Sequence, residues 1–167
     1  WSLPLILLAA LSGCGLRPVY SGGGQGAVAQ ALGHVEVAKI EGKGGWLVRN
    51  ALNDRLSVMS GAGPRYRLVV KLDDQISGFG LRADAAVTRE RRTLRARYQL
   101  IDDATGAQVL DDTAGSDAGI DVTSSEYATI AAEDTALERL SQTIADQIVA
   151  QLALFARREQ AARDSTR

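Results

Sequence analysis

The feature that most constrains the fold is a long apolar stripe near the C-terminal end of the sequence. Apolar side chains recur there in steps of three, four or seven residues, the spacing of one face of an α-helix. They are Tyr127, Ile130, Leu137, Leu140, Ile144, Ile148, Leu152 and Phe155. Thr123, Ser124 and Ser125 precede the stripe as candidate N-caps, and Glu126 fits a capping box with Thr123. The sequence therefore predicts a long C-terminal helix with one face packed on a sheet.

Four segments before this helix are predicted to be strands. Residues 34–40, 65–76, 86–101 and 108–122 show alternating side chains or lie between turn residues. Residues 46–59 instead carry apolar side chains near helical spacing. The resulting order, β-α-β-β-β-α, predicts an α+β fold. We expect a four-stranded, mostly antiparallel sheet with two helices packed on one face.

Glycine and aspartate mark the expected connections between these segments. We expect a turn at 41–45, a loop containing Gly78 and Gly80, and a hairpin turn where the sequence reads DDATGA. Gly115 and Gly119 should break the fourth strand.

The first fourteen residues resemble the leader of a bacterial lipoprotein. Residues 1–11 are uncharged and almost entirely apolar, a run that suits a signal peptide and is too short to span a bilayer. Leu11-Ser12-Gly13-Cys14 matches the lipobox motif at each of its four positions. In such signals the cysteine thiol receives a diacylglycerol, and the new amino group receives an N-acyl chain such as palmitate. Gly15 after the cysteine is typical of lipoproteins sent to the outer membrane.

These observations divide the chain into four parts. Residues 1–13 are expected to be a signal peptide, truncated at its N-terminus. Residues 14–33 would hold the lipidated Cys14 and a glycine-rich, flexible tether. Residues 34–160 would form the α+β domain, and residues 161–167 a charged, frayed tail.

The composition limits the chemistry that this chain can perform. It has one cysteine and one histidine, whereas structural zinc requires four nitrogen or sulfur ligands. No nucleophile elbow, phosphate-binding loop or metalloprotease motif occurs. The formal net charge of −1 gives no overall attraction to nucleic acid. We therefore expect no catalytic residues, no metal and no cofactor apart from the lipid on Cys14.

Basic residues gather at alternate positions of the second and third predicted strands. Alternate residues of a strand project from one face, so these side chains should share one side of the sheet. They are Arg65, Arg67, Lys71, Arg89, Arg91, Arg95 and Arg97. Two interpretations stay open. The face could bind phosphates or carboxylates through the arginine fork. Alternatively, it is an ordinary solvated face whose charges are partly neutralised by aspartates of the next strand.

With this organisation in place, the sequence resembles the LptE family of lipopolysaccharide (LPS)-assembly lipoproteins. Residues 14–20, CGLRPVY, are similar to the family segment C-G-[FW]-x-P-[LV]-Y, with Leu16 replacing the usual aromatic residue. Ser125-Glu126-Tyr127-Ala128 resembles the [NS]-x-Y-A at the start of the last helix. The order of strands and helices also fits, so the likeness covers nearly the whole chain.

The resemblance implies a lipid-anchored subunit of the LPS translocon in the outer membrane. Such proteins plug the lumen of a large LptD-like β-barrel, assist its assembly and are reported to bind LPS. The domain would then lie on the periplasmic side or within the barrel. The expected partners are the barrel, LPS and the membrane, and no nucleic acid. The seven basic residues become candidate contacts to LPS or to the barrel wall, chosen from their pattern alone.

Two other functions stay open at this level. An auxiliary or carrier lipoprotein of a different envelope lipid transporter would have an apolar cavity for acyl chains and no barrel partner. An envelope hydrolase would need a concave site containing a titratable group with a perturbed pKa.

Overall fold

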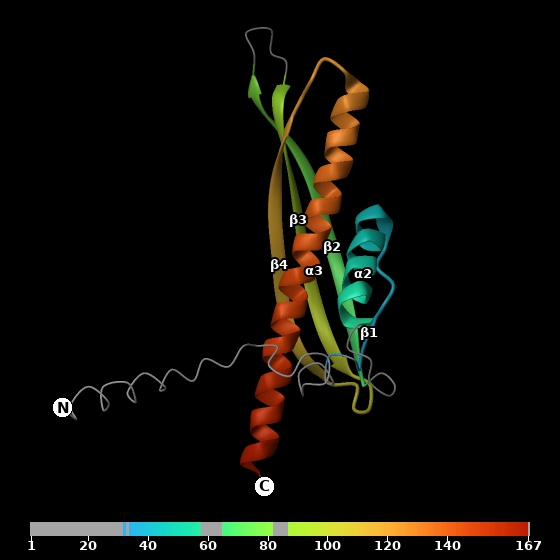
Figure 1. The fold of residues 1–167 in the computed structure, drawn as a ribbon, viewed down its shortest axis with the longest axis vertical. Helices are drawn as coiled ribbons and strands as arrows, with labels where there is room; N and C mark the ends of the chain where they lie inside the picture. The colour runs from blue at the N-terminus through green and yellow to red at the C-terminus, as the bar shows by residue number, and fades with distance from the viewer. Residues whose placement is uncertain (1–31, 33, 58–64, 82–86, 167) are drawn as a thin grey trace, which may run out of the picture.

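A four-stranded sheet covered on one side by two helices forms the domain (Figure 1). The structure is a computed structural model that describes residues 32, 34–57, 65–81 and 87–166. Cys14 and the predicted leader lie outside the described residues. The elements are β1 (Val35–Val37), α2 (Gly42–Ser57), β2 (Tyr66–Leu81), β3 (Val87–Asp102), β4 (Gln108–Asp121) and α3 (Glu126–Ser165). The predicted α+β class and the order β-α-β-β-β-α are confirmed.

The strands lie in sequence order across the sheet, β1-β2-β3-β4. β1 is parallel to β2, and the pairs β2–β3 and β3–β4 are antiparallel. The even-numbered side chains of β2 and β3 face the helices; Leu68 and Leu94 are fully buried and Tyr98 is 1% exposed. Because residues of one strand alternate between two faces, the odd-numbered side chains point away from both helices.

α3 supplies much of the core that covers the sheet. Its buried residues recur at helical spacing from Thr129 to Ala156, so one face of this long helix packs along the sheet and against α2. Leu32 is 2% exposed and belongs to the same core, which therefore begins before the predicted domain boundary at His34. At the other end, α3 continues through Ser165, beyond residue 160 where we placed the end of the domain.

β1 is shorter than the predicted strand at 34–40, whereas glycine does not interrupt β2 or β4 as predicted. The expected loop at Gly78 and Gly80 is wrong, because β2 keeps its pairing with β3 as far as Leu81 opposite Val87. Gly80 has a φ of 76° and is accommodated within this ladder. The expected break in β4 at Gly115 and Gly119 is also wrong, since both residues stay paired with β3.

α2 begins earlier than predicted, whereas α3 begins after Ser125, one of the three predicted N-cap candidates. α2 begins at Gly42, so most of the predicted turn at 41–45 is helical. Gly45 lies against the backbone of Ile40, where a Cβ would come within 2.7 Å. The N-cap of α3 is Ser125, whose side chain accepts from the N–H of Ala128, and the predicted capping box with Thr123 is wrong. No helix in the described ranges is both long and apolar enough to cross a bilayer.

Candidate functional site: the open face of the sheet

The side of the sheet away from the helices carries most of the predicted basic residues. We call it the open face and define it as the odd-numbered side chains of β2, β3 and β4. Six of the seven basic residues lie on it and are exposed: Arg67, Lys71, Arg89, Arg91, Arg95 and Arg97. Arg65 lies just before β2, with its guanidinium 5.2 Å from the Tyr66 ring centroid and 3.9 Å from the Asp102 carboxylate.

Aspartates neutralise three of these arginines. Arg97 makes two hydrogen bonds to Asp111 on β4, through Nε at 3.1 Å and an Nη nitrogen at 2.8 Å. These bonds from Arg97, together with one from Gln99, lower the pKa of Asp111 to about 2. Nε of Arg89 lies 3.1 Å from Asp121 Oδ1. Nε of Arg67 lies 3.2 Å from Asp103 Oδ1. The open face is therefore mixed in charge at these positions.

Three basic side chains remain without such a carboxylate. Within the described residues, no Asp or Glu forms an ion pair with Lys71, Arg91 or Arg95. The Arg91 guanidinium lies 5.4 Å from the centroid of the Phe79 ring. Arg95 extends across Gly115 of β4, where a Cβ would overlap its guanidinium. These three cations are the part of the open face that can still accept an external anion.

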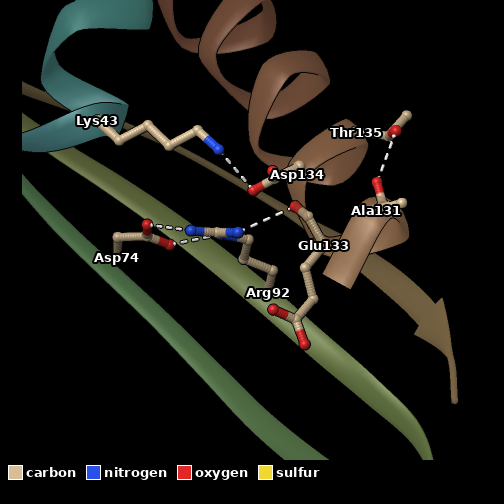
Figure 2. A network of polar contacts seen from close by, with 7 residues as sticks. All are labelled: Lys43, Asp74, Arg92, Ala131, Glu133, Asp134 and Thr135. Atoms are coloured by element: carbon tan, nitrogen blue, oxygen red, sulfur yellow. Dashed lines mark hydrogen bonds and ion pairs between the residues drawn. The ribbon is translucent and has the colours of Figure 1, made fainter. Parts of the chain in front are cut away.

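A second charged cluster lies on the helix-covered side of the sheet (Figure 2). Arg92 makes two hydrogen bonds to the Asp74 carboxylate, at 2.8 and 2.6 Å, and a third to the backbone carbonyl of Glu133 at 2.9 Å. Its side chain is only 11% exposed. Nearby, Lys43 Nζ lies 2.7 Å from Asp134 Oδ1, which joins α2 to α3. Arg92 was not among the residues predicted from the sequence, yet its hydrogen bonds link β2, β3 and α3.

Glu90 lies two residues before Arg92 on β3, on the same face of the strand, and extends the covered cluster. Burial raises the pKa of its carboxyl, and the neighbouring Glu133 carboxyl raises it further. Its Oε2 atom is buried and has no hydrogen-bond partner among the residues that the structure describes. All three Arg92 hydrogen bonds are made to groups of the fold itself. The geometry of the cluster is that of a structural link between the sheet and the helices.

Comparisons with known proteins agree on the family and the fold. The LptE family model, described as lipopolysaccharide-assembly, matches residues 32–152. A protein of Caulobacter crescentus CB15 described as a lipoprotein has a similar structure, with a TM-score of 0.66 and 28% identity over 80% of this chain and 98% of that chain. Rare lipoprotein B from Shewanella oneidensis has the same fold, with a TM-score of 0.57 and 13% identity, over 75% of this chain and 96% of that chain. No curated protein matches the sequence.

The family match covers most of the core of the described domain, from the buried Leu32 to Leu152 on the buried face of α3. It includes the whole open face and the covered charged cluster. The chain therefore belongs to the LptE family of lipopolysaccharide-assembly proteins.

Proposed function

We propose that this protein is an outer-membrane lipoprotein subunit of the LPS translocon. In this proposal it plugs the β-barrel that inserts LPS into the outer leaflet and assists the assembly of that barrel. Membership of the LptE family supports a role in LPS assembly in general. The finer proposal depends on one observation, the group of cations on the open face that lack carboxylate partners among the described residues.

The chemistry of the open face supports contact with an anionic or polar partner. Guanidinium groups bind phosphates and carboxylates in bidentate geometry, and β3 holds Arg91 and Arg95 on one face of a rigid strand. The lumen of a large outer-membrane barrel is polar, and LPS carries phosphates, so either surface offers suitable acceptors. Aspartate pairing at Arg89 and Arg97 keeps the rest of the face close to neutral, which concentrates any binding on the unpaired cations.

The anchor completes the proposal. Lipidation at Cys14 would hold the protein in the outer membrane, because several buried acyl chains give nearly permanent attachment. The domain would then lie on the periplasmic side or within the barrel lumen. Replacing Cys14 with serine should release the protein from the membrane fraction, and retention in the membrane would contradict the anchor.

Copurification tests the partnership. The tagged full-length lipoprotein should be isolated from detergent-solubilised outer membrane, and its partners identified by mass spectrometry. We expect a large β-barrel protein in a ratio near one to one. Recovery of the lipoprotein alone, or with an inner-membrane transporter, would reject the translocon proposal.

Charge reversal tests the open face. The double variant Arg91→Glu, Arg95→Glu should bind LPS or the purified barrel about tenfold more weakly, with its thermal midpoint almost unchanged. The matched control is Arg157→Glu, Arg158→Glu, which reverses two exposed charges near the end of α3. Loss of LPS binding alone identifies a phosphate contact, and loss of barrel binding alone identifies the lumen wall. Unchanged affinity for both would reject the open face as a binding surface.

A further inference from the structure

Two glycines of β4 lie opposite the two arginines of the open face that form no ion pair within the described residues. Gly115 is paired with Arg95, and Gly119 with Arg91, across the β3–β4 ladder. Neither is among the described glycines with a positive φ, so the backbone does not require glycine at either position. Glycine inside a strand instead often marks the close approach of another group. The two positions differ in the space beside them.

Gly115 leaves the space that the end of the Arg95 side chain occupies. A Cβ placed at Gly115 would overlap Nη1 of Arg95 and would come within 2.7 Å of Cδ and 3.0 Å of Cζ. The guanidinium group therefore lies directly over the backbone of β4. That backbone is held from the edge of the sheet, because the side-chain amide of Gln147 on α3 bonds to the N–H and C=O of Gly115, at 3.0 and 3.3 Å. We call the space over Gly115 the glycine slot.

Gly119 shows the opposite arrangement. Apart from its neighbours in the chain, no heavy atom of the described residues lies within 4 Å of a Cβ placed there. The facing arginine, Arg91, is directed toward β2, where its guanidinium lies 5.4 Å from the centroid of the Phe79 ring. Arg95 thus occupies the space at its glycine, whereas Arg91 leaves the corresponding space open.

A carboxylate lies on the other side of Arg95, on β2. Asp73 is paired directly with Arg95 in the β2–β3 ladder, and both side chains are on the open face. Opposite charges in this position of an antiparallel pair attract each other. The Asp73 carboxylate nevertheless accepts from the side-chain amide of Gln75, at 3.2 and 3.1 Å, and not from Arg95. The glycine slot therefore holds Arg95 on the side of β3 away from the carboxylate that directly faces it.

We propose that Gly115 is a positioning residue for anion binding by the open face. The glycine slot holds the Arg95 guanidinium over β4 and away from Asp73, so this cation stays available to an external phosphate or carboxylate. The inference rests on the proposed function, and it identifies what spares Arg95 the aspartate pairing seen at Arg89 and Arg97. An arginine that is already held in place also loses less side-chain freedom when an anion binds.

Filling the slot should change the partner of Arg95 and leave the fold intact. In Gly115→Ala, the methyl group blocks the β4 side, and Arg95 is expected to turn toward Asp73. The displaced atoms are at the end of a flexible side chain, and alanine is no worse than glycine in a strand interior, so the thermal midpoint should not fall. The new surface ion pair must be broken before an anion binds, which should weaken binding by about two- to fivefold.

The experiment measures binding of the full-length lipoprotein to purified LPS and, separately, to the purified barrel. Arg95→Gln gives the loss expected when the cation is absent, and Gly115→Ala should lose affinity for the same ligand. Gly119→Ala is the matched control on the same strand and face, and it should bind as the unchanged protein does. Equal losses in the two glycine variants would overturn the proposal, because they would show a general effect of side chains on β4.

A second substitution tests the role assigned to Asp73. Adding Asp73→Asn to Gly115→Ala removes the competing carboxylate and should restore most of the lost affinity. Adding Asp117→Asn instead removes the same charge from the same face on β4, and it should restore much less, because the methyl group directs Arg95 away from that strand. A purely structural role for Gly115 gives no such selective rescue. Equal restoration by both substitutions, or by neither, would overturn the proposal.

Nuclear Overhauser contacts in the lipoprotein without ligand test the position of Arg95 directly. The Hδ protons of Arg95 should be in contact with the Hα protons of Gly115 in the unchanged protein. In Gly115→Ala they should be in contact with the Hβ protons of Asp73. Absence of the contact to Gly115 in the unchanged protein would overturn the proposal, whatever the affinities are.

The affinities separate this inference from the proposed function. Weaker binding by Arg95→Gln together with unchanged binding by Gly115→Ala overturns the positioning role and leaves the translocon proposal intact. Unchanged affinity of Arg95→Gln for both LPS and the barrel rejects Arg95 as a binding residue of the open face, and this inference falls with it. Loss of affinity in Gly115→Ala, with selective rescue by Asp73→Asn, supports both.

Discussion

The two faces of this sheet are formed by the same strands but respond to different demands. On the covered face, Leu94 and Tyr98 are buried under α2 and α3. On the open face, Arg97 and Asp111 form an ion pair in which the arginine side chain is 65% exposed. Burial restricts which residues the covered face can carry, whereas the surface ion pairs of the open face contribute little to stability. The comparison teaches that residues of the open face can change for binding at little cost to the fold.

The largest expected difference between the two faces is in the stability effect of substituting two adjacent residues of β3. Leu94→Ala should lower the free energy of unfolding by about 2–5 kcal/mol, because it leaves a cavity in a fully buried site. Thr93→Ala, on the open face, should change it by no more than about 0.5 kcal/mol. Urea denaturation of both variants measures the difference. Equal losses would mean that the covered face is not the main core.

A smaller difference in stability is expected between substitutions of two adjacent arginines, Arg91 on the open face and Arg92 on the covered face. Arg92→Met should cost about 1–3 kcal/mol, because the Asp74 carboxylate and the Glu133 carbonyl lose their donor in a largely buried position. Arg91→Met should cost less than about 0.5 kcal/mol. Adding Asp74→Asn to Arg92→Met should recover part of the loss. A double-mutant cycle showing no coupling would contradict the link.

The smallest expected effect is the change of stability with pH. One carboxyl group on each face should contribute to it, and the two contributions should change in opposite directions as the pH rises. The pKa of Glu90 is raised in the folded protein, so its stabilising contribution is present below its ordinary pKa of 4.5 and is lost as the pH rises. Glu90→Gln, which imitates the protonated carboxyl, should raise the melting temperature by about 1–3 °C at pH 7 and leave it unchanged well below pH 4.5.

Asp111 on the open face provides the opposite case. Its pKa is lowered to about 2, so its contribution is present at neutral pH and is lost as the pH falls toward that value. Asp111→Asn should therefore slightly lower the melting temperature at pH 7, and the difference should disappear near pH 2. Thermal scans of both variants across pH check the two signs together. The same sign for both would contradict the assignment.

Local patterns in the sequence were sufficient to predict the architecture. The alternation around Leu94 and the helical spacing around Ile144 each predict which side chains are buried. The buried side chains in turn determine which face of the sheet packs against the helices. Gly78 and Gly80 misled the prediction, because a long two-stranded ladder retains residues that disfavour strands when considered alone. Tertiary pairing overrides such local preferences.

The charges were harder to predict than the fold. The sequence predicts seven basic side chains on one face, but which of them are neutralised depends on register. Asp111 lies opposite Gln99 and bonds diagonally to Arg97, an arrangement set by the β3–β4 pairing and its irregularity near Leu100. Arg92 was missed as a link because its partners come from β2 and α3, and one strand's pattern carries no information about them.

The order of the elements, with α3 after all four strands, has a consequence for folding. A chain that is synthesised or emerges with its N-terminal part first presents the strands before the helix that covers them. Twelve buried residues of α3 must dock before the apolar side of the sheet is shielded from water. Until then the polypeptide resembles a folding intermediate with an uncovered hydrophobic surface, the kind of species that aggregates or requires a chaperone. A chain truncated within α3 should therefore be degraded by proteases faster than the complete domain.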